Sequence, residues 1–328
     1  MSSNPLFAAL AARPADAVVL RGGDRDWSAA EVLAEVEACA ARLEGCRSLA
    51  ILADNGPAWV IADLAALRAK VAQVPVPGFF NAAQLAHLFE QGGVDAVLTD
   101  QPERIAALGA GFVHHDDWQE LAWMTRPARP LALPPGTAKV SFTSGSTGNP
   151  KGVCLSGRGL LDTAAAISAR LADLPIERHL AVLPLALLLE NSAGIYAPLL
   201  RGAEIVLPPL AALGWRGMAG FDPTSLQRTI EAIRPDSLIL VPELLKAWSL
   251  YLAATGGQAP DSLDYVAVGG ARVDRAALAA AHRLGIPAYQ GYGLTECGSV
   301  VCLNRPGDDG DGVGRPLDHV AVDVDHAE

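Results

Sequence analysis

Short apolar segments alternate with helical segments along most of this chain, and that alternation limits the fold more than any other feature. In the first third, residues 48–52, 71–76 and 94–99 are expected to be strands, separated by expected helices at residues 59–68 and 82–89. Apolar strands joined through helices pair in parallel, with helices covering both faces of the sheet. The sequence therefore predicts an α/β fold with parallel sheets flanked by helices.

The same alternation continues through the rest of the chain. An early helix is expected to begin at Ser28, which forms a capping box with Glu31, and to end at Gly45. Beyond residue 136, strands are expected at 139–143, 181–183, 204–207, 237–241, 263–268 and 286–289, and helices at 158–171, 224–233, 243–252 and 275–284.

This pattern also indicates how the chain divides. We expect a first α/β subdomain at residues 1–136, ending in a proline-rich stretch, and a second at residues 137–303. The start of a third, β-rich subdomain is expected at residues 304–328, where alternating valines at 320, 322 and 324 indicate a half-buried strand.

Composition excludes several classes of protein. Hydrophobic residues make up 51% of the 328 residues, which is enough for a large core, and 19% charged residues argue against disorder. The formal net charge is −11, and no run of lysine and arginine indicates a nucleic-acid partner. Five cysteines without a CxxC pair are expected to be reduced thiols of a cytoplasmic protein.

No targeting or membrane segment is expected. The N-terminus lacks the pattern of a secretory signal. The most apolar stretch, residues 180–200, is interrupted by Glu190, Asn191 and two prolines, so it predicts a buried strand and a pocket-lining loop. The adjacent His114 and His115 cannot face one point on a regular element, so residues 114–117 are expected to form a solvated loop and not a metal site.

The strongest chemical signal is the segment SFTSGSTGNPKGV at residues 141–153, which follows an expected strand and precedes an expected helix. Its glycines let the backbone turn and let a ligand approach closely, and successive amides in such a loop form an anion-binding nest. The hydroxyls of Thr143, Ser144, Ser146 and Thr147 and the charge of Lys151 add donors. The segment is not a Walker A loop, because it has no Gly-Lys-Ser/Thr. It is expected to bind a triphosphate; a flexible surface turn is the weaker alternative.

Three segments, in order, resemble the signatures of the adenylate-forming superfamily, which includes acyl-CoA synthetases, luciferases and peptide-synthetase adenylation domains. The loop at 141–153 resembles the phosphate-binding signature, Gly269-Gly270-Ala271 the Gly-Gly-Ala turn, and QGYGLTE at 290–296 the Tyr-Gly-x-Thr-Glu motif. A weaker match is GVGRP at 312–316. The likeness covers essentially the whole chain and is greatest to the fatty acyl-CoA synthetase branch of AMP-dependent synthetases and ligases.

The resemblance implies a reaction. The carboxylate of an acid attacks the α-phosphate of ATP, giving an acyl-adenylate and pyrophosphate, and thioester formation with coenzyme A follows. ATP and Mg²⁺ are thereby implied as cofactors and coenzyme A as co-substrate. The protein contributes positioning and charge neutralisation.

The resemblance also implies roles for residues. Thr295 binds the α-phosphate, Glu296 holds Mg²⁺, and Tyr292 lies against the adenine. Gly270 and Ala271 border the adenine and the reacting carboxylate. Lys151, Thr295 and Glu296 are the implied catalytic residues. The implied phosphate-binding set is Thr143, Ser144, Gly145, Ser146, Thr147, Gly148 and Lys151.

Residues 183–191, LPLALLLEN, depart from the family pattern. Many acyl-CoA synthetases have a histidine beside the acyl carboxylate where this chain has Leu187, and the aspartate of the amino-acid-activating branch is also not found. The apolar surroundings favour a fatty or other apolar acid. The implied substrate-binding residues are Leu187, Glu190, Asn191, Gly270 and Gly291.

Beyond these motifs the family has a Thr-Gly-Asp motif, a hinge and a small C-terminal domain with a lysine, and none of these occurs before Glu328. We therefore expect this polypeptide alone to bind nucleotide weakly and turn over little, since domain closure completes such sites. The missing domain could be supplied in cis or in trans. The alternative function is a non-catalytic nucleotide- or acyl-binding module, or half of a split enzyme.

Overall fold

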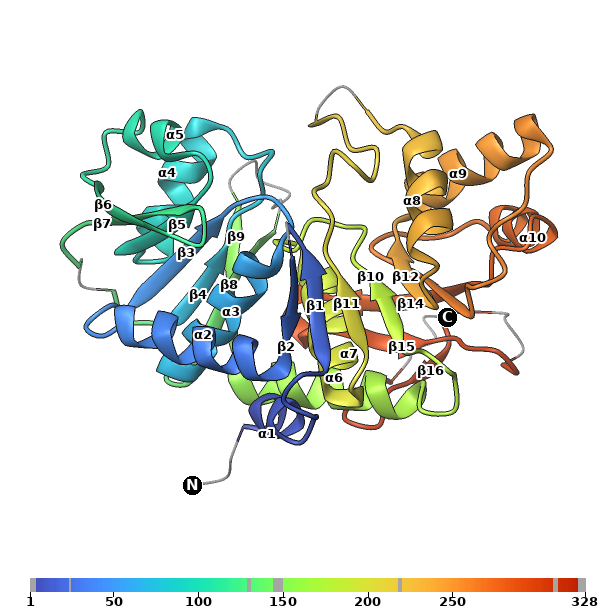
Figure 1. Cartoon of the computed structure of the whole chain (residues 1–328), viewed down its shortest axis with the longest axis horizontal. Coiled ribbons are helices and arrows are strands. Elements are labelled where there is room, and N and C mark those ends of the chain that lie inside the picture. The colour runs from blue at the N-terminus through green and yellow to red at the C-terminus, as the bar shows by residue number, and fades with distance from the viewer. Residues whose placement is uncertain are drawn as a thin grey trace.

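The computed structural model describes residues 4–23, 25–128, 131–143, 150–217, 220–308 and 312–323. Within these ranges the strands form two sheets, one of seven strands and one of nine, and each sheet is flanked by helices (Figure 1). The two sheets lie in two lobes that share a continuous hydrophobic core. The prediction of an α/β fold with parallel strands between helices is confirmed.

The seven-stranded sheet has a parallel centre and antiparallel edges. Helix α3 (Pro57–Ala69) follows β3, and α4 (Ala82–Gln91) follows β4. A short α5 (Pro102–Ala106) follows β5. The strand order is β6 (Val113–Trp118), β7 (Leu121–Thr125), β5 (Ala96–Thr99), β3 (Ser48–Leu52), β4 (Ala72–Pro75), β8 (Thr137–Thr143) and β9 (Lys151–Ser156).

In the nine-stranded sheet, the central strands β14, β13, β12, β10, β11 and β1 pair in parallel. The edge strands β2, β15 and β16 pair antiparallel with their neighbours. The order is β16 (Arg315–Pro316), β15 (Ser299–Leu303), β14 (Ala288–Leu294), β13 (Tyr265–Val268), β12 (Ser237–Leu240), β10 (Arg178–Leu180), β11 (Glu204–Val206), β1 (Val18–Gly22) and β2 (Arg25–Ser28).

The two faces of the nine-stranded sheet are covered by different helices (Figure 1). One face packs on α8 (Pro223–Ile233), α9 (Pro242–Thr255) and α10 (Arg275–Arg283). The other packs on helices α6 and α7 and on the wide-turn π-helix that leads into α7. Their bounds are α6 (Gly157–Arg170), the π-helix (Glu190–Tyr196) and α7 (Ala197–Arg201), with α1 (Pro5–Ala11) and α2 (Ala29–Arg42) nearby.

Helix α3 joins the two lobes. Nearly all of its side chains are buried, from Trp59 to Ala66, and an apolar helix without a polar face must be enclosed on all sides. It packs against α2 and β4 of one lobe and β1 of the other.

The two sheets do not divide at residue 136, because β1 and β2 join the nine-stranded sheet while β8 and β9 join the seven-stranded one.

Several local predictions were wrong. Residues 181–183 are not a strand, since β10 ends at Leu180, whereas residues 184–187 form the expected loop and the π-helix begins at Glu190. Residues 114–117 belong to strand β6, although their side chains are exposed as expected. The described part of the final segment, residues 320–323, is not a strand, and Val322 is exposed. None of the helices in the described ranges combines the length and apolarity that a membrane span needs.

Candidate functional site

The β8–β9 hairpin presents the first part of the candidate site. Strand β8 is buried along most of its length and emerges at Thr143, which pairs directly with Lys151 at the start of β9. Lys151 is exposed, so its ammonium faces solvent at the open end of the hairpin. The sequence-predicted residues Ser144, Gly145, Ser146, Thr147 and Gly148 lie outside the described residues. This hairpin differs from the sequence-based prediction, in which the loop leads directly into a helix; strand β9 lies between them.

The β14–β15 hairpin presents the second part. Tyr292 near the end of β14 is 46% exposed, and Thr295 and Glu296 open a short 3-10 helix (Thr295–Cys297). Gly293 is required here, since a Cβ at this position would lie 1.8 Å from the Ser299 carbonyl oxygen. The two strands approach closely at Gly293, and Thr295 and Glu296 follow directly after β14 ends at Leu294.

The two hairpins converge in space. Cα atoms of β9 lie within 8 Å of Cα atoms of the 3-10 helix that holds Thr295 and Glu296. Thr143 and Thr295 also line one and the same cavity. A phosphate bound between them would therefore meet the hydroxyls of two segments about 150 residues apart in sequence.

A glycine-rich turn after β13 forms the third part of the candidate site. Gly270 has φ +87°, a left-handed conformation that favours glycine, and a Cβ built there would lie 3.5 Å from Val241 Cγ1. Gly270, Ala271, Gly291, Tyr292 and Gly293 border two cavities at once. The turn and the hairpin thus form a partition between an inner cavity of about 630 Å³ and an outer one of about 910 Å³.

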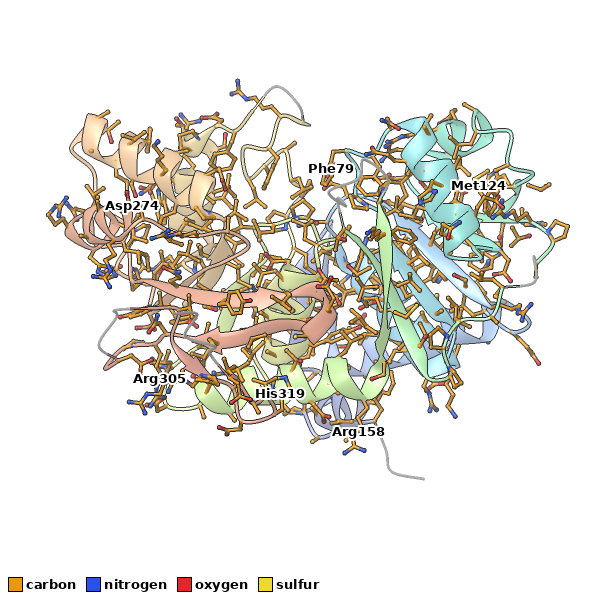
Figure 2. All side chains as sticks on the ribbon, turned by 180° about the vertical axis from the view of Figure 1, so that it is seen from behind. Phe79, Met124, Arg158, Asp274, Arg305 and His319 are labelled. Atoms are coloured by element: carbon orange, nitrogen blue, oxygen red, sulfur yellow. The ribbon has the colours of Figure 1, made fainter. Side chains whose placement is uncertain are left out.

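The inner cavity runs between the nine-stranded sheet and the helices α6, α7 and the π-helix. Leu187 and Gly291, two of the residues that the resemblance implies for substrate binding, line it. Phe79, 62% exposed, stands at its mouth on the side of the seven-stranded sheet that faces the other lobe (Figure 2). Its apolar wall includes Leu183, Leu187, Leu189, Ala193, Ile239 and Val241.

Glu190 and Asn191, expected to contact substrate, are not part of the cavity lining. Both are at most 1% exposed, because the π-helix turns their side chains into the protein interior. Glu190 accepts a hydrogen bond from the Leu183 amide at 3.0 Å and lies 3.1 Å from His179 Nε2. The structure thus gives these two side chains interior hydrogen bonds in place of the assumed substrate contact.

Asn191 belongs to a second buried network around Lys139. The Lys139 ammonium, whose side chain is 2% exposed, donates to Asp63 Oδ1 and Asn191 Oδ1, each at 2.7 Å. Asp63 Oδ2 in turn accepts from Asn191 Nδ2 at 3.0 Å and from the Tyr196 hydroxyl at 2.7 Å. Burial lowers the pKa of Lys139, although Asp63 opposes that shift. The network ties β8, α3 and the π-helix together behind the site.

Several further polar residues line the inner cavity, and the sequence analysis did not identify them as site residues. His179 on β10 and Ser237 on β12 are cross-strand neighbours, and His179 Nδ1 lies 2.9 Å from Ser237 Oγ. No local motif surrounds either residue. Only the sheet register shows that they meet, and that register depends on long-range pairing.

The exposed carboxylate of Glu296 fits the Mg²⁺ role that the sequence suggested. Mg²⁺ keeps several waters and is held by one or two carboxylates together with substrate phosphates. A cage of protein ligands is accordingly not required, and the described residues contain no group of three or more His, Cys, Asp or Glu side chains that could form one. Glu296 follows Thr295 in the 3-10 helix and offers a single exposed carboxylate there.

Comparison with known proteins agrees with this geometry. The chain is 30% identical over 281 residues to the nonribosomal peptide synthetase kk1B of Curvularia clavata, covering 82% of this chain and 2% of that protein. It is 34% identical over 181 residues to a long-chain-fatty-acid–CoA ligase of Thermus thermophilus, covering 54% of this chain and 31% of that protein. This chain therefore spans less than a third of either relative.

A solved structure shares the fold. The o-succinylbenzoate CoA synthetase of Bacillus subtilis superposes with a TM-score of 0.76 at 22% identity, covering 96% of this chain and 64% of that one. The family of AMP-binding enzymes matches residues 7–328. Since that match runs over nearly the whole chain, this protein belongs to the AMP-binding, adenylate-forming enzymes.

Proposed function

We propose that this chain binds ATP with Mg²⁺ and a carboxylic acid with a largely apolar tail, and that it joins them as an acyl-adenylate. A carboxylate oxygen attacks the α-phosphorus, and the bond from that phosphorus to pyrophosphate breaks. The observation that carries the proposal is the convergence of Thr143 and Thr295 at the mouth of an apolar cavity. Nucleotide and acid would meet at that mouth.

Each part of the site would contribute one interaction. Lys151 and the hydroxyl of Thr143 would bind the β- and γ-phosphates, and Thr295 would donate to the α-phosphate oxygen on which charge accumulates. Mg²⁺ would neutralise phosphate charge when held by Glu296. Tyr292 and the Gly270–Ala271 turn would enclose the adenine from the outer cavity. The Bacillus subtilis synthetase has been solved with ATP and a magnesium ion, which is consistent with this assignment.

The acid is proposed to be fatty or otherwise apolar, not an amino acid. Leucine, alanine and valine side chains dominate the inner cavity, and burial of an apolar tail there is favourable. Among the described lining residues the one carboxylate is Glu243, which is exposed in the first turn of α9. An ammonium group held there would be solvated and weakly bound. Coenzyme A is the proposed acyl acceptor, as the name of the Thermus thermophilus long-chain-fatty-acid–CoA ligase indicates for that relative.

Equilibrium binding tests the proposal on this chain. We expect a non-hydrolysable sulfamate analogue of decanoyl-adenylate to bind in a calorimeter. We expect Thr295→Ala to weaken that binding by about 10- to 150-fold, since hydrogen bonds to charged groups contribute about 1.5–3 kcal/mol. Ser249→Ala is the matched control, because Ser249 is buried on α9 outside both cavities.

The proposal also predicts magnesium dependence for ATP itself. Glu296→Gln should weaken ATP binding in the presence of Mg²⁺ and have much less effect in its absence, because the carboxylate acts through the metal. Absence of binding by both ATP and the adenylate analogue would refute the proposed function. Tighter binding of an aminoacyl analogue than of the decanoyl one would overturn the assignment of the acid.

A further inference from the structure

Three polar residues on neighbouring strands, called the polar row below, line the inner cavity on the nine-stranded sheet, although the cavity wall is otherwise mostly apolar. His179, Ser237 and Tyr265 are direct cross-strand neighbours on β10, β12 and β13, and all three line the cavity. One step along the strands, Ile239 and Ala267 form an apolar row on the same face. A polar row under an apolar wall would be costly unless its groups had partners.

The position of this row relative to the mouth follows from strand geometry. Val241 lies beside the Gly270 turn, since a Cβ built at Gly270 would be 3.5 Å from Val241 Cγ1, and the reacting carboxylate is proposed to lie at this turn. Ser237 is the first residue of β12 and lies four residues before Val241, which directly follows the end of that strand. At roughly 3.3 Å per residue the two are about 13 Å apart, which is about the length of an extended ten-carbon chain. The polar row therefore lies at the depth that the far end of a medium-length acyl tail would reach.

The row is held in place from behind. Glu190 lies 3.1 Å from His179 Nε2, and His179 Nδ1 lies 2.9 Å from Ser237 Oγ. Gly194 leaves the room for this pair, since a Cβ there would lie 2.0 Å from Glu190 Oε1 and 2.8 Å from His179 Nε2. A π-helix with a glycine at this turn thus admits a buried carboxylate that orients the imidazole.

Ser237 has hydrogen-bonding capacity left over in either arrangement of protons. If Glu190 is ionised, it accepts from His179, which accepts from the Ser237 hydroxyl and leaves the Ser237 oxygen free to accept. If Glu190 is protonated, which its burial favours by raising its pKa, the chain of donors reverses and the Ser237 hydroxyl can donate. A hydroxyl group both donates and accepts, so it suits Ser237 in both states.

Resting on the proposed function, we infer that the far end of the inner cavity recognises a hydroxyl group at or near the end of the acyl tail, with Ser237 as the contact residue and His179 and Glu190 as positioning residues. The substrate class is a hydroxy fatty acid of medium length. An unsubstituted tail would leave the remaining hydrogen-bonding capacity of Ser237 unsatisfied, and a site built around a hydroxyl discriminates against analogues that lack it.

Arg201 is an alternative to Ser237 as the residue that recognises the end of the tail. Arg201 also lines the cavity, but its guanidinium already donates to the carbonyls of Leu171 and Leu174 at 2.8 and 2.7 Å. If Arg201 were the recognition element, a tail ending in a carboxylate would bind best. Comparison of terminal methyl, hydroxyl and carboxylate groups on one chain length separates these possibilities.

The experiment measures binding of decanoate, ω-hydroxydecanoate and sebacate to this chain by calorimetry, with a non-hydrolysable ATP analogue and Mg²⁺ present. We expect ω-hydroxydecanoate to bind about five- to tenfold more tightly than decanoate, as one additional neutral hydrogen bond predicts. Ser237→Ala should reduce that preference to about twofold or less, and Ser237→Val should reverse it. Ser249→Ala, a buried serine outside the cavity, should keep the preference.

The outcomes separate this inference from the proposed function. Equal affinity for decanoate and ω-hydroxydecanoate, or a preference that survives Ser237→Ala in a folded variant, would overturn the inference and leave acid activation standing. Tightest binding of sebacate would assign recognition to Arg201 and also overturn it. Failure of all three acids to bind would refute both. Circular dichroism of each variant establishes that it is folded.

Discussion

The buried pair between Lys139 and Asp63 gives the sharpest prediction about stability. The two side chains are 2% and 1% exposed and meet at 2.7 Å, and Asn191 and Tyr196 supply the remaining hydrogen bonds. At an effective dielectric of about 20, charges at this distance attract by roughly 6 kcal/mol. Desolvation of both ions offsets much of that attraction, so the pair itself contributes little net stability.

Removal of one partner is different, because it leaves the other charge buried and unpaired. Lys139→Met should lower the free energy of unfolding by about 3–5 kcal/mol. The double variant Lys139→Met with Asp63→Asn removes both charges, so it should be more stable than the sum of the single changes by about 1–3 kcal/mol. Arg68→Met, in the exposed pair with Glu37, is the control and should cost about 0.5 kcal/mol or less.

Urea unfolding followed by circular dichroism measures these changes, with the transition midpoint compared at constant slope. Lys139→Met should also disturb the candidate site, because β8 continues from Lys139 to Thr143 and the π-helix carries both Asn191 and the cavity-lining Ala193. A loss below about 1 kcal/mol for Lys139→Met, or strict additivity in the double variant, would refute the claim that this pair is electrostatically coupled in the interior.

Two further predictions concern the polar row. Burial raises the pKa of Glu190 above its ordinary value of 4.5, so the folded state binds more protons than the unfolded state just above pH 4.5 and stability falls as pH rises towards the raised pKa. Glu190→Gln should flatten that part of the profile, which thermal unfolding from about pH 4 to about pH 7 would measure; an unchanged slope would contradict the assignment. Gly194→Ala should destabilise the protein by about 1–3 kcal/mol, because the added methyl overlaps Glu190 Oε1, and stabilisation in a urea titration would contradict the packing argument.

Local patterns in the sequence predicted most elements of the fold. The helix that begins after Ser28 has its expected capping box with Glu31, because capping depends on residues three positions apart. The central parallel strands were also predicted, since buried strands are continuous apolar runs. Of the missed elements, β6 and β9 are largely exposed and the π-helix is irregular, and tertiary contacts determine their conformation. The strands β7 and β15 were also missed, although they are buried and apolar.

For the candidate site, the sequence by itself determined the chemistry of the parts: a loop rich in hydroxyls and glycines, a glycine turn, and the Thr295-Glu296 pair. The tertiary structure decided which side chains face the acid. It turned Glu190 and Asn191 away from the cavity and brought His179 and Ser237 into it. The physical reason is that residue type and local spacing are encoded within a few positions, whereas cavity lining depends on strand register and helix packing between distant segments.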